Sequence, residues 1–388
     1  MSVLAAVIVS VGQGQAQPVQ QVGTSTSFDV ATWNVEWFGA TGSGQGPANE
    51  ALQLENVASI IEGAGIDLWA LQEISSVSAF SQLLTRLGAQ WTGEIAPFTQ
   101  TQRTAYIWRP DVVLKLSTRL ILQEQSNVFA GRPPFEFRAL VTLPDTTFEV
   151  TLVNVHMKAG ADQSDYDQRI AAASALKARF DFFRAFSAIT FMLIGDLNDE
   201  LGSSIRTGLP SPYRALVEDP ANYRFLTAQL DAADACTWCP SGIPQTGTES
   251  GSTLDHILIS REAFPLADRG MSDRMRSVLA ADPFFPVYTS DHVPVYARLQ
   301  GPLPTSIEPL PRDAGLSIYP VPARDHLRIE RSGAASHSGS VELFDLLGRR
   351  VRAVTEASLI LDWNLEGLAP GLYSLVIGGR PVRLVPVL

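Results

Sequence analysis

The chain has 388 residues, of which 45% are apolar and 18% are charged, and its formal net charge is −11. The length exceeds the roughly 100–200 residues of an average domain, and the composition excludes a disordered protein. The acidic balance excludes long-range attraction of polyphosphates. A phosphate ester would therefore have to be bound by local cations, either a metal ion or a few well-placed Arg and Lys side chains.

The first residues carry the pattern of a secretory signal. An apolar run over residues 3–9 precedes Gly14 and Ala16, which are small at positions −3 and −1 of a cleavage site. We expect a signal peptide over residues 1–16, too short to span a membrane, with a structureless apolar terminus as the alternative. No other stretch of the sequence is long enough to cross a bilayer, so stable membrane insertion is not expected.

Residues 27–300 mix helix and strand patterns and are expected to form one domain. Apolar residues keep helical spacing over 54–63, 77–88 and 166–183. Apolar or alternating runs predict strands over 28–37, 66–74, 104–110, 135–143, 148–158, 191–199, 254–260 and 293–299. Many strands with helices inserted between them predict an α+β domain, in which sheets pack together and helices lie outside.

The two cysteines, Cys236 and Cys239, stand close together in the sequence CTWC. Two thiolates fall short of the four ligands of a structural zinc site, and the pair does not open a helix after a strand, as a redox motif would. We predict a small disulfide loop that staples an exported protein, with metal binding and redox chemistry as the alternatives.

The sequence changes in kind after residue 300. Residues 301–313 hold four prolines and predict a stiff linker. Residues 314–388 carry short alternating runs separated by Gly, Pro and Ser, which are typical of a small antiparallel β-sandwich. A large domain and a small one, joined by the linker, are therefore expected.

Many of the predicted strands end or begin with acidic, amide or histidine residues. Each such residue alone is explained by solvation or by capping of a turn. Gathered at one rim, they would be costly neighbours without a compensating cation. Carboxylate and amide oxygens suit Mg²⁺ or Mn²⁺, and Ca²⁺ is a further candidate. The residues concerned are Asn34, Glu73, Asn154, His156, Asp196, Asn198, Asp255, Asp291 and His292.

The motifs that carry these residues are WNVEW, LQE, VNVHMKAG, GDLND, LDHI and SDHVPV, in that order along the chain. With this ordered set, residues 28–300 resemble the endonuclease/exonuclease/phosphatase superfamily, which includes deoxyribonuclease I, abasic-site endonucleases, sphingomyelinases and inositol polyphosphate phosphatases. The resemblance implies a deoxyribonuclease I-like, four-layered α/β/β/α sandwich that cleaves phosphoesters with a divalent metal.

The resemblance also implies roles for the oxygen-bearing residues, motif by motif. Asn34 and Glu73 match the metal-binding asparagine and glutamate of the superfamily, and Asp291 matches a further carboxylate at the metal site. Asp196 and Asn198 match the pair that orients the nucleophile and the phosphate.

Two histidines are implicated in the same way. His292 matches the histidine that activates the attacking water or contacts the phosphate. His156 matches a second histidine of deoxyribonuclease I, which would act, when protonated, as an acid or an oxyanion stabiliser. Asp255 matches the aspartate that hydrogen-bonds a catalytic histidine, and which of the two it supports stays open.

Three basic residues are candidates for binding the substrate phosphate. Arg132, in GRPPFEF, lies where many relatives place a phosphate-binding arginine, and a turn residue beside two prolines is the alternative. Arg103 and Lys158 are further candidates. Residues 99–102 read Thr-Gln-Thr-Gln where deoxyribonuclease I-like sequences offer a tyrosine to the DNA minor groove, which weakens the transfer of that binding mode.

The small domain resembles the C-terminal sorting domain of the type IX secretion system. The resemblance rests on LSIYPVPARDHLRIE, VELFDLLGRRV and LEGLAPGLYSLVIGG, although Val321 replaces the third residue of the usual YPNP motif. It implies recognition by secretion machinery and a location outside the cell or on its surface. A carbohydrate-binding or adhesion β-sandwich is the alternative.

We therefore predict an exported, metal-dependent nuclease that hydrolyses DNA or RNA, although the acidic charge counts against tight nucleic-acid binding. A phosphodiesterase or phosphatase acting on phospholipid, in the manner of a sphingomyelinase, or on inositol phosphates is the alternative. The apolar residues 281–288 would suit contact with a membrane. A non-catalytic surface binding module is a third hypothesis, disfavoured because the whole set of site residues is present.

Overall fold

The computed structural model describes most of the chain from residue 19 onward. The predicted signal peptide, 1–16, and the predicted linker, 301–313, lie outside the described residues. The described ranges are 19–144, 146–184, 190–243, 249–267, 271–281, 284–300, 316–321, 323–331, 340–345, 349–354, 360–377 and 380–387.

Twelve strands between Phe28 and Leu299 build two six-stranded sheets, with strand orders β11-β12-β1-β2-β4-β3 and β5-β6-β7-β8-β10-β9. The first sheet consists of β1 (Phe28–Phe38), β2 (Leu68–Ile74), β3 (Thr92–Ile95), β4 (Arg103–Trp108), β11 (Met271–Arg274) and β12 (Val295–Leu299). The second consists of β5 (Val113–Leu120), β6 (Phe135–Leu143), β7 (Thr146–His156), β8 (Thr190–Asp196), β9 (Tyr223–Phe225) and β10 (Asp255–Ser260).

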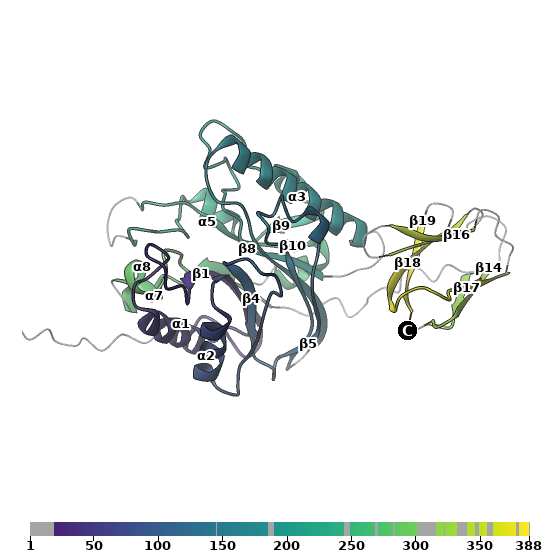
Figure 1. The fold of residues 1–388 in the computed structure, drawn as a ribbon, viewed down its shortest axis with the longest axis horizontal. Helices are drawn as coiled ribbons and strands as arrows, with labels where there is room; N and C mark the ends of the chain where they lie inside the picture. Colours follow the sequence, from purple (N-terminus) through teal and green to yellow (C-terminus); the bar gives the residue numbers. More distant parts are fainter. Residues whose placement is uncertain are drawn as a thin grey trace, which may run out of the picture.

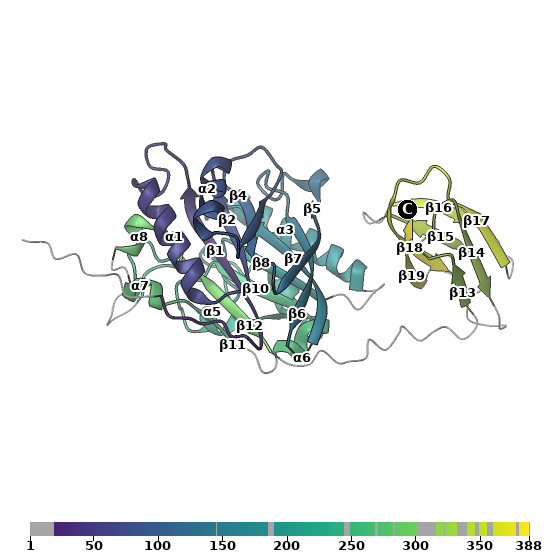
Figure 2. The same ribbon diagram turned by 90° about the horizontal axis from the view of Figure 1, so that it is seen from below.

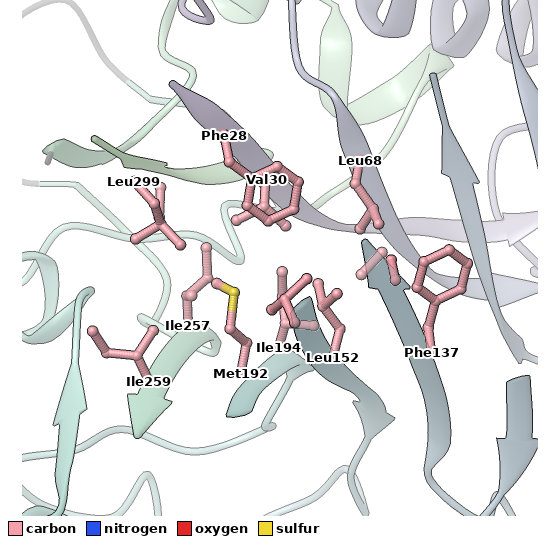
Figure 3. Close-up of a cluster of buried hydrophobic side chains, with 14 of the residues drawn as sticks. Phe28, Val30, Leu68, Phe137, Leu152, Met192, Ile194, Ile257, Ile259 and Leu299 are labelled. Atoms are coloured by element: carbon pink, nitrogen blue, oxygen red, sulfur yellow. The ribbon is translucent and has the colours of Figure 1, made fainter. Parts of the chain in front are cut away.

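The two sheets pack face to face, and helices cover their outer faces (Figure 1, Figure 2). Apolar residues of both sheets, among them Val30, Leu68, Leu152 and Ile194, form the core between them (Figure 3). α1 (Glu50–Ala64) and α2 (Val77–Leu87) pack on the first sheet, and α3 (Gln163–Arg184) packs on the second. The expected four-layered α/β/β/α sandwich is confirmed.

The first two helices begin where the sequence supplies a capping side chain. Asn49 caps α1 and Ser76 caps α2, each by accepting a backbone N–H of the first turn. α1 ends at Ala64 and is capped by Gly65, whose φ of 71° is left-handed, so it continues past Gly63. Across the described ranges, none of the helices combines the length and the apolar composition that a bilayer span requires. The shorter helices are α4 (Arg214–Val217), α5 (Ala228–Ala232), α6 (Phe264–Ala267), α7 (Ser277–Ala281) and α8 (Phe285–Tyr288).

α3 buries a charged residue that its apolar spacing does not predict. The spacing places Ile170 on the buried face, but 38% of Ile170 is exposed, whereas the neighbouring Arg169 is fully buried. Arg169 donates to Asp199 Oδ2 at 2.9 Å and to the backbone oxygens of Lys158 and Gly160 at 2.7 and 2.8 Å. The arginine therefore ties the segments that follow β7 and β8 to the helix, because a buried guanidinium needs charged and carbonyl partners.

The strand registers bring the polar strand ends to one edge of the sandwich. β1 and β2 are parallel, with Asn34 opposite Gln72, and β7 and β8 are parallel, with His156 opposite Asp196. β10 runs antiparallel to β8 and starts with Asp255 opposite Asp196. The carboxyl ends of these parallel strands therefore meet the amino end of β10.

The strands after residue 315 form a separate pair of antiparallel sheets, ordered β13-β14-β17 and β16-β15-β18-β19. Ile329 and Trp363 of the first sheet share a buried cluster with Leu343 and Leu375 of the second. The small antiparallel β-sandwich is confirmed, while the domain limits of 27–300 and 314–388 stay predictions. The strands are β13 (Leu316–Tyr319), β14 (His326–Arg331), β15 (Val341–Phe344), β16 (Arg350–Val354), β17 (Ile360–Asn364), β18 (Gly371–Ile377) and β19 (Arg380–Val387).

Two buried carboxylates lie at the start of β1 and just before β2. Asp67 Oδ2 accepts the backbone N–H of Asp29 at 2.9 Å, and Arg109 Nη1 lies 3.8 Å from Asp67 Oδ1. Burial raises the pKa of Asp67 to about 7, from an ordinary value of 3.8; the charges of Asp29 and Asp111 act in the same direction, and the hydrogen bond from Asp29 and the charge of Arg109 oppose it. The folded protein therefore binds a proton at Asp67 at pH values where the unfolded chain does not.

This difference predicts that part of the stability is lost as the pH rises through 7. The contribution of protonated Asp67 is full below the unfolded pKa near 4, and it declines up to the folded pKa of about 7. We expect urea unfolding of Asp67→Asn to show a flatter pH profile between pH 5 and 8.5. Between about pH 4 and about pH 7, the free energy of unfolding of the variant should rise relative to that of wild type by up to roughly 4 kcal/mol. Parallel profiles for the two proteins would contradict the assignment.

Candidate active site

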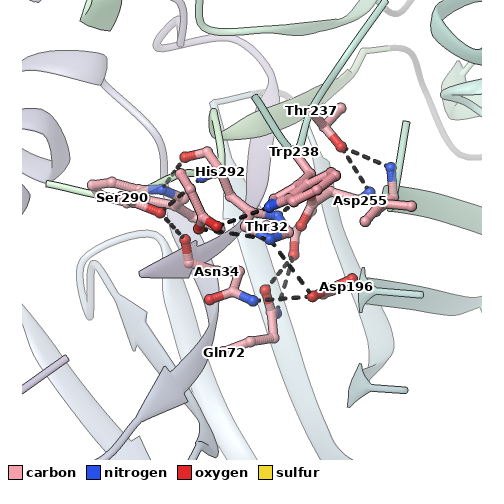
Figure 4. Close-up of polar contacts among 12 residues, drawn as sticks. Thr32, Asn34, Gln72, Asp196, Thr237, Trp238, Asp255, Ser290 and His292 are labelled. Carbon is pink, nitrogen blue, oxygen red and sulfur yellow. Dashed lines mark hydrogen bonds and ion pairs between the residues drawn. The ribbon is translucent and has the colours of Figure 1, made fainter. Parts of the chain in front are cut away.

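His292 and Asp255 form a buried pair at the edge where the strands end (Figure 4). His292 Nδ1 donates to Asp255 Oδ2 at 2.8 Å. The backbone of His292 is held as well, because its N–H donates to Ser290 Oγ at 3.0 Å and its carbonyl accepts from Trp33 Nε1 at 2.8 Å. The imidazole is thereby fixed, with its Nε2 4.0 Å from Asp196 Oδ2.

The surroundings of His292 favour its protonated form. Burial lowers the pKa of the imidazole, but the charges of Asp255, Asp291 and Asp196 and the hydrogen bond to Asp255 raise that pKa well above its ordinary value. An imidazolium whose Nε2 faces the acidic group can donate a hydrogen bond to an anionic oxygen.

Asn34 links the ends of three strands. Its Nδ2 donates to Glu73 Oε1 at 3.2 Å and to Asp196 Oδ2 at 3.0 Å, and its Oδ1 accepts the backbone N–H of Glu36 at 3.0 Å. Glu73 Oε2 accepts the backbone N–H of Trp37 at 2.9 Å. Glu36 and Glu73 have φ values of 42° and 63°, in the left-handed region. Such strain costs about 1–3 kcal/mol per residue and persists where the surrounding structure imposes it.

Glu36 is a residue of this group that the sequence analysis did not assign. Its Oε2 accepts the backbone N–H of Asp291 at 3.0 Å. Burial raises the pKa of Glu36 to about 7, and the charge of Asp291 adds to the increase. The signal that could have found it is its place in WNVEW, two positions after Asn34 and so on the same strand face.

Asp196 occupies the centre of the group. Burial raises its pKa to about 7; the charge of His292 opposes this shift, and the charge of Asp255 adds to it. Asp196 Oδ1 accepts the backbone N–H of Asn198 at 2.8 Å, and Asn198 Nδ2 donates to Met157 O at 3.3 Å. The polar end of GDLND is therefore held by hydrogen bonds within the site.

The oxygen atoms of this group fit a hard divalent cation. Ligand atoms of Asp196, Asp255 and His292 lie within 4.8 Å of one another. Asp255 Oδ2 is engaged by His292, while its buried Oδ1 has no hydrogen-bond partner among the residues that the structure describes. The raised pKa values of Glu36 and Asp196 mark carboxylates short of positive charge, which oxygen-coordinated Mg²⁺ or Mn²⁺ would supply. The expected ligands Asn34, Glu73 and Asp291 all belong to this group.

His156 lies on the other side of the acidic group. Its Nε2 is 3.7 Å from Glu73 Oε1 and 3.6 Å from Asp196 Oδ2. Burial lowers the pKa of His156 well below its ordinary value, and the charges of Arg132 and His292 lower it further. The neutral imidazole is therefore favoured, which suits a hydrogen-bond donor better than the protonated acid expected from the sequence.

The three candidate phosphate-binding residues have different surroundings. Arg132 donates to His156 O at 3.1 Å and to Met157 O at 2.8 Å, and its guanidinium interacts electrostatically with the carboxylates of Glu73 and Asp196. Lys158 instead forms a 2.9 Å ion pair with Asp165 at the start of α3. Arg103 donates to Gln100 O at 3.2 Å. The structure thus brings Arg132 to the acidic group and gives Lys158 an acidic partner on α3.

The CTWC segment lies beside the site. Cys236 and Cys239 are joined in a disulfide, as expected for a staple. Trp238, between them, donates its Nε1 to Asp291 Oδ2 at 2.8 Å (Figure 4). The sequence analysis assigned no role to Trp238, because a contact between positions 53 residues apart leaves no local pattern.

Comparisons with known proteins identify two families along the chain. The Endonuclease/Exonuclease/phosphatase family matches residues 31–292. The Secretion system C-terminal sorting domain matches residues 317–381. Both expected resemblances are confirmed. None of the curated protein sequences compared with the chain matches it significantly.

Solved structures with the same fold share little sequence with the chain. One is TDP2 from D. rerio complexed with a single-strand DNA product, with 18% identity, a TM-score of 0.50, and coverage of 71% of this chain and 99% of that one. Another is an endonuclease/exonuclease/phosphatase from Beutenbergia cavernae, with 13% identity, a TM-score of 0.51, and coverage of 93% and 98%. At this level of identity the likeness shows the fold alone.

Because the carboxylates of the site lack neighbouring positive charge, we expect a divalent cation with Asp291 among its ligands to stabilise the folded protein. Thermal unfolding should shift upward with Mg²⁺ or Mn²⁺ and return with EDTA, since a ligand at a hundred times its Kd adds about 2.7 kcal/mol. Asp291→Asn keeps an oxygen for Trp238 but removes the charge beside Glu36. We expect this variant to lose the metal-dependent shift while its metal-free Tm stays at or above that of wild type.

Asp273→Asn, an exposed change on β11, is the matched control and should keep the full shift. A metal-dependent shift in Asp291→Asn as large as in wild type would show that Asp291 is not a ligand.

Proposed function

Because the chain belongs to the endonuclease/exonuclease/phosphatase family, whose members hydrolyse phosphoester bonds, we propose that it is an exported, divalent-metal-dependent nuclease. Its class, a phosphoester hydrolase, follows from the family, and the nucleic-acid substrate is the proposed part. The observation that carries the proposal is the Asp255–His292 pair, whose Nε2 faces the acidic group around Asn34.

The residues divide into a cation-binding side and a proton-handling side. Asn34, Glu73 and Asp291 would hold Mg²⁺ or Mn²⁺, which polarises the phosphate and lowers the pKa of bound water. Asp196, whose carboxylate lies between Asn34 and His292, is suited to orient the attacking water and to accept its proton, and Asn198 steadies the turn that carries it.

The groups that can donate hydrogen bonds to a phosphate lie on two sides of the acidic group. His292, held by Asp255, is suited to donate from Nε2 to a phosphate oxygen and to stabilise the charge that develops there. Arg132 and neutral His156 lie across the acidic group and can donate to the other oxygens of the phosphate. Arg103 and Lys158 are kept as outer candidates. Two histidines facing one acidic group favour the deoxyribonuclease-like assignment.

The sorting domain indicates that the protein is secreted or held on the cell surface. We infer that residues 1–16 act as the signal peptide and that secretion machinery is the partner of residues 314–388. A disulfide between Cys236 and Cys239 is consistent with an oxidising compartment outside the cytoplasm.

A lipid phosphodiesterase is the second candidate, and one surface feature favours it. Phe284, Val287 and Tyr288 are 61%, 58% and 39% exposed, and they lie on and beside α8, just before Asp291. Exposed apolar side chains next to a phosphoester site would suit a phospholipid substrate. Hydrolysis of sphingomyelin or inositol phosphate without cleavage of DNA or RNA would favour this candidate.

The proposal predicts metal-dependent cleavage that requires His292. Plasmid DNA, RNA, bis-p-nitrophenyl phosphate and sphingomyelin should be offered with Mg²⁺, Mn²⁺ and Ca²⁺, and cleavage should stop with EDTA. We expect His292→Ala to lower kcat about 10²–10⁴-fold, because it removes the group that donates to the phosphate. Asp255→Asn should act in the same direction, because it removes the negative charge that favours protonated His292.

His326→Ala, on β14 of the small sandwich, is the matched control and should leave kcat unchanged. Inactivity of wild-type protein on every substrate and metal would favour the binding module. Equal rates for His292→Ala and wild type would overturn the assignment of His292.

A further inference from the structure

We propose that the CTWC loop, residues 236–239, which a disulfide closes, is a positioning element. It orients the carboxylate of Asp291 toward the cation, and Trp238 is the residue of the loop that contacts this carboxylate. The inference rests on the proposed metal site. It assigns a role in cation affinity to residues that the sequence marks only as a structural staple.

The loop holds Asp291 by both its side chain and its backbone. Trp238 Nε1 donates to Asp291 Oδ2 at 2.8 Å, and the backbone N–H of Cys239 donates to Asp291 O at 2.7 Å. Among the hydrogen bonds of the described residues, the one from Trp238 alone reaches a carboxylate oxygen of Asp291. Oδ1, the oxygen left without such a bond, lies 3.9 Å from His292 Nε2. The hydrogen bond from the Trp238 indole therefore determines which carboxylate oxygen of Asp291 faces the site.

The same loop also supports the histidine pair. Thr237 Oγ1 accepts the backbone N–H groups of Leu254 and Asp255, both at 2.9 Å, and Thr237 O accepts the N–H of Val293 at 2.7 Å. These bonds fix the backbone of Asp255 and of the residue that follows His292. One short loop therefore sets the relative placement of Asp291, His292 and Asp255.

The loop is anchored on its far side, so it can act as a fixed support. Arg274 Nη1 donates to Cys236 O at 2.6 Å and pairs with Glu249, whose Oε2 accepts the N–H of Cys236 at 3.2 Å. Trp238 and Ser252 exchange backbone hydrogen bonds at 3.0 and 3.2 Å. The disulfide closes the turn, and both cysteines are 1% exposed.

Asp291 needs such support because the neighbouring carboxylate of Glu36 repels it, although its Oδ1 lies 3.9 Å from His292 Nε2 on the other side. Glu36 lies close enough for its Oε2 to accept the N–H of Asp291, and the charge of each carboxylate acts on the other. Without a donor on Oδ2, the side chain of Asp291 would turn away from Glu36 into solvent when the cation is absent. A ligand that must be turned back on binding lowers the affinity, and removal of such supporting hydrogen bonds typically costs about 10–100-fold in metal affinity.

The test is Mn²⁺ binding to Trp238→Phe, measured by isothermal titration calorimetry on the full chain, with kcat and KM measured beside it. The change keeps an aromatic ring and removes the N–H donor. We expect Mn²⁺ affinity to fall about tenfold. Activity should recover at raised Mn²⁺, which a purely structural defect would not show. Trp91→Phe is the matched control, because Trp91 is 8% exposed and lies just before β3, at the opposite edge of the sheet from β11.

A second variant keeps the inference testable if Trp238→Phe unfolds. Cys236→Ala/Cys239→Ala leaves the indole in place but frees the loop, and it should also weaken Mn²⁺ binding while its circular dichroism spectrum stays native. Mn²⁺ affinity within twofold of wild type in either folded variant would overturn the inference. In that case loss of binding in Asp291→Asn would leave the proposed function standing, whereas wild-type protein that neither binds Mn²⁺ nor cleaves a phosphoester would overturn both.

Discussion

The site depends on the repulsion between carboxylates that the strand registers force together. Asn34 and Glu73 come from β1 and β2 of one sheet, and Asp196 comes from β8 of the other. The ladders fix the strand ends within each sheet, and the face-to-face packing of the two sheets brings the three side chains together. Burial then removes the water that would screen their charges, which raises the pKa values of Asp196 and Glu36 to about 7. Positive charge placed among these carboxylates would relieve their repulsion, and a divalent cation would supply it.

The chain itself supplies few positive charges to the site, and the surroundings of each histidine determine whether it carries one. His292 is the one histidine of the site that its neighbours drive toward protonation, because Asp255 fixes it and the other carboxylates surround it. His156, in a drier place beside Arg132, is driven the other way. The surroundings of these two histidines thus shift their pKa values in opposite directions, and the roles proposed for them rest on that difference.

The strand ends and the layers could be predicted because they depend on local sequence. Apolar runs that finish in Asn, Asp or His mark both the strands and the rim, and the order of the motifs predicts the fold. Contacts between distant segments could not be predicted. Arg169 is buried in place of Ile170 because its guanidinium pairs with Asp199, which follows β8. Lys158 forms an ion pair with Asp165 on α3. Such pairings are set by tertiary packing, which overrides the apolar spacing of a helix.

The CTWC loop could be identified from the sequence, but the sequence does not show which segments the loop contacts. The disulfide is visible as two cysteines, and its role as a staple follows from their number. What it staples is visible only when Trp238 and Thr237 are seen to touch Asp291, Asp255 and the backbone beside His292. A disulfide persists in an oxidising compartment, and the sorting domain sends the chain toward one. The disulfide that closes the CTWC loop can therefore persist in the compartment to which the chain is sorted.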